Sequence, residues 1–531
     1  MNPHLAIVPI VLPLVAGALQ LLAGERRPRT TVAIGLASCA ALLATAVLML
    51  LATVDAPGAI PAVYRIGDWP ARFAIVLVAD RLSVLMVLLT AVLALAVLPA
   101  ASGRWQQRGN YFQPLFQFLL MGLNGAFLTG DLFNLFVFFE VLLAASYGLV
   151  LHGSGRRRVG AGLHYIAINL AASMLFLLGV SLVFGVTGTL NMAALAQLIP
   201  AVPENTRALL HAGAALLGIA FLVKTAMWPL GFWLPRTYAA SVPAVAAMFA
   251  LMTKVGIYVL LRVGTLLFGG EAGASSHFGS DWLLWGGMAT IVVGAVGMLG
   301  ARDLGKIAGY NVLVSSGTLL GAIALHQPLV TAGALAYLVI STLGIAALFL
   351  VAGLIVPEGE EQDDEALQLE PYEPLDGDPR ADVLYAEEDE SRVVIPAPVA
   401  MLGLSFLACT MLLAGLPPLS GFLAKFAMLA PMLELPRADG TLWLFGLVIG
   451  AGLCTVVAMS RAGIYVFWAD HDRVFPQARV TEVAAIALLL GLCLGLTVFA
   501  RAPMAFLRDT AQRLHEATHY VDAVLPAEAD R

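Results

Sequence analysis

Runs of about twenty hydrophobic residues recur from one end of the chain to the other and predict a bundle of membrane-spanning helices. The runs start near Leu5, Thr31, Leu82, Tyr111, Leu132, Gly160, Ala208, Val242, Trp282, Leu304, Val330, Pro396, Leu442 and Val480. Because the bilayer core holds no water to satisfy exposed backbone groups, each run should form a helix. The predicted fold is therefore an all-α integral membrane protein with about fourteen transmembrane helices.

The basic residues of the connecting loops divide unevenly between the two sides of this predicted bundle. Alternate loops on one side hold Arg26, Arg27, Arg29, Arg104, Arg108, Arg156, Arg157, Arg158, Arg236, Arg302, Lys306, Arg473 and Arg479, and those on the other hold only Arg65, Arg72, Arg81, Arg207, Arg262 and Arg437. Loops rich in lysine and arginine face the cytoplasm. We therefore expect the first set to be cytoplasmic and both termini to lie outside. Residues 1–24 lack the basic start of a signal peptide, which favours a first transmembrane helix.

Two segments depart from the hydrophobic pattern. Residues 357–393 are rich in Glu, Asp and Pro, which predicts a solvated loop on the cytoplasmic side. Residues 502–525 carry apolar or small side chains at helical spacing, namely Leu507, Ala511, Leu514, Thr518 and Val521. This spacing predicts an amphipathic helix that lies on the membrane or on a partner protein.

A repeated motif divides the chain into units. The sequence MTKVGIYV at 252–259 is matched by MSRAGIYV at 459–466, and a proline interrupts the apolar run upstream of each, in WPLGF at 228–232 and PPLSGF at 417–422. We infer two five-helix units, 111–262 and 282–468, with helices 1–3 in 1–100 and a last helix and tail in 480–531. An odd number of helices inverts the second unit relative to the first. Inverted repeats with broken helices are typical of secondary transporters.

The composition and the positions of the lysines indicate that lysine is the residue type that transfers protons. The chain is 60% hydrophobic and 12% charged, with a mean hydropathy of +0.88. It contains four lysines, and three of them, Lys224, Lys254 and Lys425, lie inside apolar runs, as does Glu140. Each charge at the bilayer centre costs roughly 2.5 to 3.5 kcal/mol. A buried lysine can release and regain a proton, which arginine cannot do. A Glu–Lys pair with a movable partner would be a proton switch, and the alternative is a static ion pair that fixes helix packing.

Weaker candidates accompany these four residues. His164 can relay protons near neutral pH or serve as a packing residue, Tyr310 begins a polar side of the tenth span, and Arg461 is the repeat counterpart of Lys254. The breaks at Pro229 and at Pro417 and Pro418 either line a cavity or only shape the bundle. The four cysteines show no metal-ligand spacing, and no P-loop or nucleophile motif appears, so we expect no metal, no cofactor and no enzymatic activity. We also expect no nucleic-acid partner.

Four motifs resemble those of the D-type subunit of the Mrp sodium/proton antiporters. They are GDLFNLFVFFEV at 130–141, FLVKTA with WPLGFWLP at 221–235, ALMTKVG at 250–256 and GLPPLSGFLAKF at 415–426. The resemblance covers nearly the whole chain. The wider superfamily also includes the proton-pumping membrane subunits of respiratory complex I.

This resemblance implies a fourteen-helix subunit with broken helices 7 and 12 in a multisubunit complex of the bacterial cell membrane, exchanging Na⁺ for protons. By residue match, Glu140 and Lys224 would form the first-half pair, Lys254 the central relay and Lys425 the second-half terminal site. The chain departs from the family pattern in its eleventh span, which carries no charge, and at Asn311 and His164. The proton path past Lys254 would then depend on water and neutral polar groups, or run through only part of the subunit.

Three functions are compatible with these residues. The first is an ion-translocating antiporter subunit whose partners are other membrane subunits, Na⁺, H⁺ and the lipid bilayer. The second is a proton-pumping subunit of an energy-converting NADH dehydrogenase or hydrogenase, which would use the same residues. The third is a structural subunit without conduction, against which the retained intramembrane lysines count.

Overall fold

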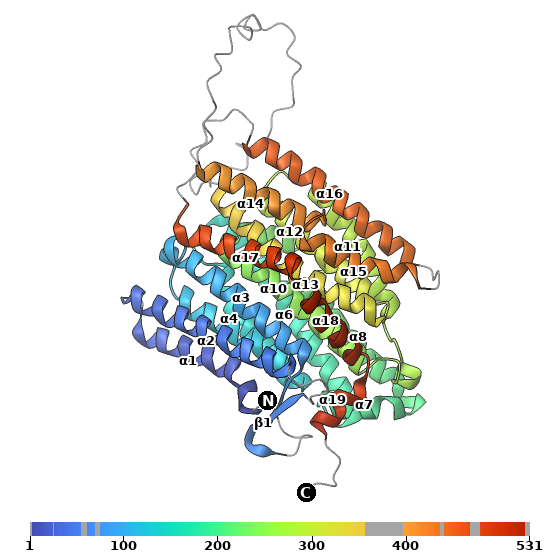
Figure 1. The fold of residues 1–531 in the computed structure, drawn as a ribbon. Coiled ribbons are helices and arrows are strands. Elements are labelled where there is room, and N and C mark those ends of the chain that lie inside the picture. The colour runs from blue at the N-terminus through green and yellow to red at the C-terminus, as the bar shows by residue number, and fades with distance from the viewer. Residues whose placement is uncertain are drawn as a thin grey trace, which may run out of the picture.

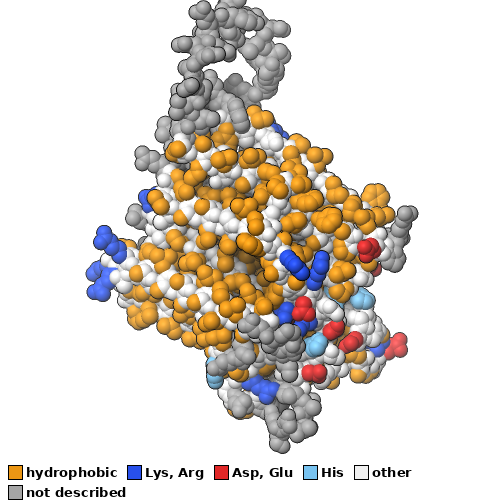
Figure 2. Space-filling view, in the orientation of Figure 1, with side chains coloured by type: hydrophobic (Ala, Val, Ile, Leu, Met, Phe, Trp, Pro, Cys, Tyr) orange, Lys and Arg blue, Asp and Glu red, His pale blue; other side chains and the backbone are white. Residues whose placement is uncertain are grey.

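A computed structural model of the chain describes residues 3–24, 26–54, 61–69, 75–355, 397–435, 440–467 and 478–525. The acidic segment 357–393, predicted to be a solvated loop, lies outside the described residues. Helices run side by side in one bundle, with α1 and α2 along one flank and α14 and α16 along the opposite flank (Figure 1). Hydrophobic side chains cover most of the face in view, and charged groups lie at its left edge and in a cluster toward its lower right (Figure 2). This surface suits a bundle whose sides contact lipid or other membrane proteins.

The first part of the chain contains three long helices and a small sheet: α1 (Val8–Ala23), α2 (Pro28–Val54), β1 (Ala62–Arg65), β2 (Val76–Ala79) and α3 (Arg81–Arg104). The strands pair antiparallel, with Ala62 opposite Ala79 and Arg65 opposite Val76. The chain is thus all-helical as predicted except for this short hairpin, which the sequence did not predict. Its apolar segments are only four residues long, too short to cross a bilayer, and valine favours the extended backbone.

The remaining helices follow in two blocks and a tail. The first block is α4 (Phe112–Leu128), α5 (Leu132–Val150), α6 (Arg156–Thr187), α7 (Met192–Leu198), α8 (Glu204–Lys224), α9 (Leu234–Ala240) and α10 (Pro243–Leu266). The second is α11 (Ser280–Gly300), α12 (Leu304–Ile323), α13 (Pro328–Ile355), α14 (Ala397–Ala414), α15 (Ser420–Leu429) and α16 (Thr441–Phe467). The chain then continues through α17 (Val480–Val498), α18 (Arg501–Leu514) and α19 (Ala517–Val524).

The hydrophobic runs of the sequence correspond closely to these helices. Each of the fourteen predicted starts lies within four residues of the start of a helix. Within the described part of the chain, eleven helices are long and apolar enough to cross a membrane, and α12, the tenth predicted span, is not one of them. Four shorter apolar helices are Val8–Ala23, Phe112–Leu128, Met192–Ala201 and Ser420–Leu433. Both predicted breaks interrupt the helices, at 225–233 between α8 and α9 and at 415–419 between α14 and α15. The Trp228–Pro229 and Pro417–Pro418 peptide bonds in these breaks are cis.

Two helices form the centre of the bundle. The apolar windows of α10 and α13 are 94% and 89% buried, whereas that of α17 is only 28% buried. A helix that is hydrophobic all round and enclosed by neighbours leaves no side exposed to lipid. Lys254, in the middle of α10, therefore lies at the centre of the helix bundle.

The C-terminal tail forms the predicted amphipathic structure, but in two helices and with a different contact. Its buried side chains include Leu507, Leu514, Tyr520 and Val524. Helix α18 packs against α13, and α19 packs against α7 and β1 (Figure 1). The expectation that the apolar face lies on the membrane or a partner is corrected, because that face covers helices of the same chain.

Candidate ion-translocation site

The three intramembrane lysines lie in different helices and are all buried. Lys224 is the last residue of α8, Lys254 is in the middle of α10 and Lys425 is in α15. Their exposed fractions are 7%, 0% and 8%. Because a buried charge is stable only with polar partners, the contacts of each ammonium group determine what it can do.

The ammonium group of Lys224 contacts a neutral amide. Its Nζ donates to Asn169 Oδ1 at 3.1 Å and lies 5.8 Å from the centre of the Phe139 ring. Glu140 of α5 is close enough for its charge to act on Lys224. However, the two form no ion pair within 4.0 Å among the described residues, and the buried Glu140 Oε1 has no hydrogen-bond partner there. The pair is thus near but separated, with an acceptor left unsatisfied.

The ammonium group of Lys254 contacts a chain of hydroxyl groups. Its Nζ donates to Ser315 Oγ of α12 at 2.8 Å, and Ser315 Oγ lies 3.0 Å from Ser341 Oγ of α13. Tyr337 also lies near Ser315. The eleventh predicted span, α13, carries no charge, and its contribution to this chain is a neutral hydroxyl group. Hydroxyl groups can both donate and accept, so they can pass a proton along a file.

The ammonium group of Lys425 contacts backbone rather than side chains. Its Nζ donates to the carbonyl oxygens of Leu413 at 3.1 Å and Ala414 at 2.8 Å, at the end of α14. These carbonyls are freed by the break at 415–419, because the last carbonyls of a helix have no partner within it. A β-carbon at Gly415 or Gly452 would stand 3.2 or 3.4 Å from Nζ. The break and two glycines together form the site.

The secondary candidates lie apart from these lysine sites. His164 is exposed on the outer side of α6, and its Nδ1 lies 2.9 Å from the Gly160 carbonyl of the same helix. Tyr310 is half-buried beside Gly297. Arg461 is exposed, and its Nη2 donates to the Ala301 carbonyl at 2.6 Å. Among the described residues no hydrogen bond joins any of the three to a lysine, so their part in transport stays a prediction.

The structure also contains a buried ion pair that the sequence did not predict. Arg262 was expected in a loop, yet its Nη1 in α10 lies 2.6 Å from Asp80 Oδ2, and the two side chains are 6% and 13% exposed. The guanidinium also lies over the rings of Tyr258, at 5.6 Å, and of Tyr520, at 5.2 Å. Burial alone would raise the pKa of Asp80, but Arg262 and hydrogen bonds from Ser83 hold that pKa below its usual value.

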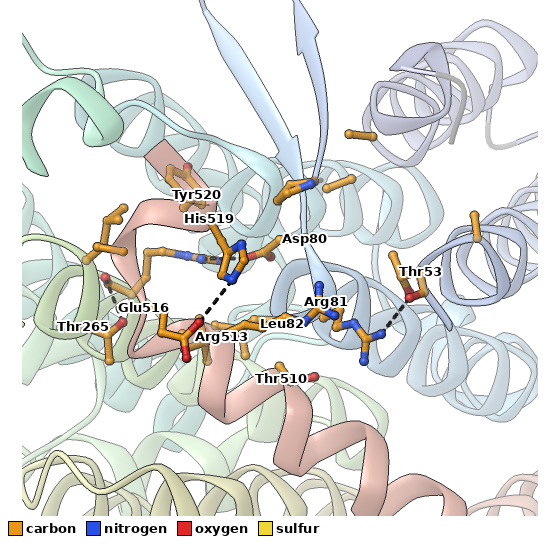
Figure 3. Close-up of a pocket in the computed structure, with 18 residues that line it drawn as sticks. Thr53, Asp80, Arg81, Leu82, Thr265, Thr510, Arg513, Glu516, His519 and Tyr520 are labelled. Atoms are coloured by element: carbon orange, nitrogen blue, oxygen red, sulfur yellow. Dashed lines mark hydrogen bonds and ion pairs between the residues drawn. The ribbon is translucent and has the colours of Figure 1, made fainter. Parts of the chain in front are cut away.

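This pair lies beneath the C-terminal tail. Asp80, Arg262 and Tyr520 line a small cavity of about 70 Å³, closed on one side by α18 and α19 (Figure 3). Arg81, which also lines the cavity, pairs with Asp509 of α18 at 2.6 Å. Two signals were present in the sequence: the Asp80-to-Ser83 spacing of a helix cap, and the four-residue steps from Lys254 to Tyr258 to Arg262, which place all three on one face of α10. In the described ranges, no three His, Cys, Asp or Glu side chains are grouped to hold a metal.

Comparison with known proteins places these residues in a family context. Residues 129–374 match the family model described as "NADH:quinone oxidoreductase/Mrp antiporter, TM". The chain is 49% identical to the probable D-type subunit of a K⁺/H⁺ antiporter of Rhizobium meliloti (strain 1021), over 99% of this chain and 98% of that protein. It is 32% identical to the D-type subunit of an Na⁺/H⁺ antiporter of Alkalihalophilus pseudofirmus, over 98% and 99%. Among solved structures, a chain of the Mrp complex from Dietzia sp. DQ12-45-1b matches with a TM-score of 0.81 and 26% identity, over 99% and 100%.

Proposed function

The chain belongs to the family of D-type subunits of Mrp antiporters, and we propose that it is the ion-translocating subunit of a multisubunit monovalent cation/proton antiporter. The observation that carries the proposal is the set of three buried lysines. Each ammonium group contacts a neutral oxygen, and none forms an ion pair within the described residues. A protein that needed only packing would not retain such costly groups at this depth.

The first half of the proposed path is a switch between Glu140 and Lys224. In the described arrangement the ammonium rests on Asn169, while a buried oxygen of Glu140 has no partner. Movement of Lys224 onto Glu140 would form an ion pair and hold the proton. Movement back removes that electrostatic support, and the ammonium then passes its proton to the next carrier.

The second half of the proposed path begins at Lys254 and ends at Lys425. Ser315 and Ser341 extend from Lys254 into α12 and α13, and Lys425 stands at the broken end of α14. Hydroxyl groups and water would carry protons across the uncharged α13 segment between them. Glu140, Lys224, Lys254 and Lys425 thus act in sequence, with His164, Tyr310 and Arg461 outside the main route.

We also propose the finer architecture that these roles require. The fourteen runs would cross the membrane fourteen times, with inverted units at 111–262 and 282–468, 1–100 before them and 480–531 after them. The interruptions beside Pro229 and beside Pro417 and Pro418 occupy corresponding places in the two units, which supports the inversion. The basic loops would face the cytoplasm, and both termini would lie outside the cell membrane.

The transported cation is Na⁺ or K⁺. The Na⁺ expectation rests on the motif resemblance, but the 49% identical relative is named as part of a K⁺/H⁺ antiporter and the Na⁺/H⁺ relative is 32% identical. K⁺ is therefore the second candidate. The respiratory-pump and structural-subunit alternatives have weaker support, because the relatives matched over almost the whole chain are named as antiporter subunits.

The test is transport by the complete complex, expressed with its neighbouring genes in cells that lack Na⁺/H⁺ and K⁺/H⁺ antiporters. In inverted vesicles we would add Na⁺ or K⁺ and record collapse of the proton gradient for wild type, Lys224→Ala and Lys306→Ala. Lys306 is the fourth lysine and lies in the first turn of α12, away from the proposed path. We expect loss in Lys224→Ala only. Equal activity in all three would overturn the switch, and no response of assembled wild type to either cation would favour a respiratory pump.

A further inference from the structure

Three histidines gather where the C-terminal tail meets two loops of the bundle. His277 lies in the loop between α10 and α11, His326 lies in the connection between α12 and α13, and His515 ends α18. The ring centres of His277 and His326 are 4.3 Å apart, and His515 lies near both. The described residues contain no group of three such side chains placed to bind a metal, which leaves the proton as the ion that they bind. None of the three belongs to the proposed proton path.

Hydrogen bonds fix the neutral form of His326. The Ser280 hydroxyl lies 2.6 Å from the His277 carbonyl, which can only accept, so the hydroxyl proton points there. Ser280 Oγ must then accept from His326 Nε2, at 2.8 Å. The proton of neutral His326 is therefore on Nε2, and Nδ1 is the nitrogen left to bind a second proton.

His515 can take a second proton only when the tail moves. Its Nδ1 lies 3.0 Å from the Ala511 carbonyl and must donate to it, so Nε2 is the unprotonated nitrogen. That Nε2 is buried and has no hydrogen-bond partner among the described residues. A proton placed there would create a buried donor without an acceptor, on a charged ring. Because such a group is costly, protonation of His515 favours exposure of the ring.

No negative charge stands against the three rings to stabilise an added proton. Within the described residues, no carboxylate lies within 4.0 Å of any of them. Glu516 acts on His515 from the tail, but it is exposed and pairs with His519 at 3.1 Å. The other charged groups near the two loops and on the tail, each exposed or ion-paired, are Glu271, Asp281, Arg501, Arg508, Asp509, Arg513 and Asp522.

Docking of the tail and protonation of the cluster therefore compete. Burial, together with His277 and His515, lowers the pKa of His326 from 6.5 to about 4, and burial also lowers the pKa of His515. A group that binds protons less well in the docked state favours docking above its free pKa. This contribution to docking is present above about pH 6.5 and is lost as the pH falls toward 4.

We propose that His277, His326 and His515 form a pH-sensitive clasp, which holds α18 and α19 on the bundle at neutral and alkaline pH and loosens them in acid. Helix α18 packs against α13, and residues of the tail line the cavity over Asp80 and Arg262. In the proposed topology the clasp faces the outside of the cell, so external acidity would be the signal. Tail docking is measured without transport, so the clasp stands or falls apart from the proposed function.

The test is hydrogen exchange of the complete complex in nanodiscs, followed by mass spectrometry at pH 8, 6.5 and 5. Exchange of peptides from 501–525 is compared with that of the same peptides in the unfolded chain, which removes the intrinsic effect of pH. Full exposure of His326 would favour opening about 30-fold between pH 8 and pH 5. We expect wild-type exchange to rise about tenfold, because the ring stays partly covered. At pH 5 the Asp80–Arg262 pair should still be intact.

Asparagine is the substitution that fits both loop histidines. His277 and His326 have left-handed backbone, with φ of 56° and 49°, which asparagine tolerates, and asparagine binds no proton in this range. We expect tail exchange in His326→Asn to change less than twofold between pH 8 and pH 5. His519→Asn is the matched control, because His519 lies on the same tail, is exposed and belongs to no part of the clasp. It should respond to pH like wild type.

Several results would overturn the clasp. Equal tail exchange in wild type at pH 8 and pH 5 would do so, as would an equal pH response in wild type and His326→Asn. Loss of the response in His519→Asn would assign it to the pair with Glu516 instead. If His326→Asn does not assemble, the exposed His277→Asn decides. Loss of His277 removes a charge that opposes protonation of His326 and His515, so the clasp requires a smaller pH response in this variant.

Discussion

The two helix breaks each place a lysine next to interrupted backbone, yet they use it differently. Lys224 precedes its break, and its ammonium reaches across to the side chain of Asn169 with Glu140 nearby. Lys425 follows its break and donates to the carbonyls that the break itself releases. No described carboxylate pairs with Lys425. In the proposed mechanism, the first site would respond to a neighbouring charge, and the second to the geometry of the broken helix.

Arginine substitutions at Lys224 and Lys425 should have the largest effect on transport. They test whether both lysines carry protons. Arginine keeps the positive charge and the donors but does not release its proton. We expect Lys224→Arg and Lys425→Arg each to lower cation-dependent proton transport on the order of 100-fold, the scale of a lost acid–base group. Initial rates in inverted vesicles, corrected for the amount of complex, give the measurement.

The same measurement tests whether the lysines at the two helix breaks both carry protons. Lys306→Arg serves as the control and should transport like wild type. If Lys425→Arg retains activity while Lys224→Arg loses it, Lys425 is only a positive cap on α14, and the second half of the proposed path is wrong.

A substitution at a glycine beside the second break should leave the first break unchanged. It should lower transport less than the arginine substitutions do. A β-carbon at Gly452 would stand 2.7 Å from the Ala414 carbonyl oxygen and 3.4 Å from Lys425 Nζ. Crowding of this size costs on the order of 1 to 3 kcal/mol, so Gly452→Ala should lower transport about tenfold. Gly450, two residues away in α16, has open space around it, and Gly450→Ala should change little. Equal rates in the two variants would show that the ammonium does not depend on this contact.

The link between the two halves can be tested at neighbouring serines. Ser315 accepts from Lys254, whereas the buried Ser316 hydroxyl has no partner among the described residues. Ser315→Ala should lower transport about threefold to tenfold, the loss expected for one hydrogen bond in the path. Ser316→Ala changes the same atom one residue away and should have no effect. A water file that bypasses Ser315 would be indicated if both variants match wild type.

The hydrophobic pattern predicted the helices well, because twenty-residue apolar runs have few alternatives in a membrane. It also identified the lysines and both breaks, since buried lysine and mid-span proline stand out against this composition. It could not identify their partners: Asn169, Ser315 and the Leu413 carbonyl come from other helices or from backbone, and only packing brings them together. Arg262 looked like a loop residue because it stands near the end of a span, and Asp80 reaches it from 182 positions earlier in the chain.

A substitution in the Asp80–Arg262 pair, which the sequence did not predict, should have the smallest effect on transport. This pair also contrasts most clearly with Glu140 and Lys224. Asp80 and Arg262 are in contact at 2.6 Å, whereas Glu140 and Lys224 are not, so we expect the former pair to be static. Asp80→Asn should change transport less than about twofold but destabilise the protein by about 3 to 5 kcal/mol, because it leaves Arg262 buried without its partner. Arg157→Gln removes an exposed ion pair of 3.1 Å to Asp303 and should cost about 0 to 1 kcal/mol.

Thermal unfolding of the purified complex measures the difference in stability between Asp80→Asn and Arg157→Gln. Proteolysis of the tail gives a second measure of it. The folded pKa of Asp80 is lowered, so the stability contributed by the pair is present above the unfolded value of about 4 and is lost as pH falls through the folded value. Wild type should therefore lose stability below about pH 4 in a way that Asp80→Asn does not. Strong loss of transport in a stable Asp80→Asn complex would mean that contact distance does not separate static pairs from switches in this bundle.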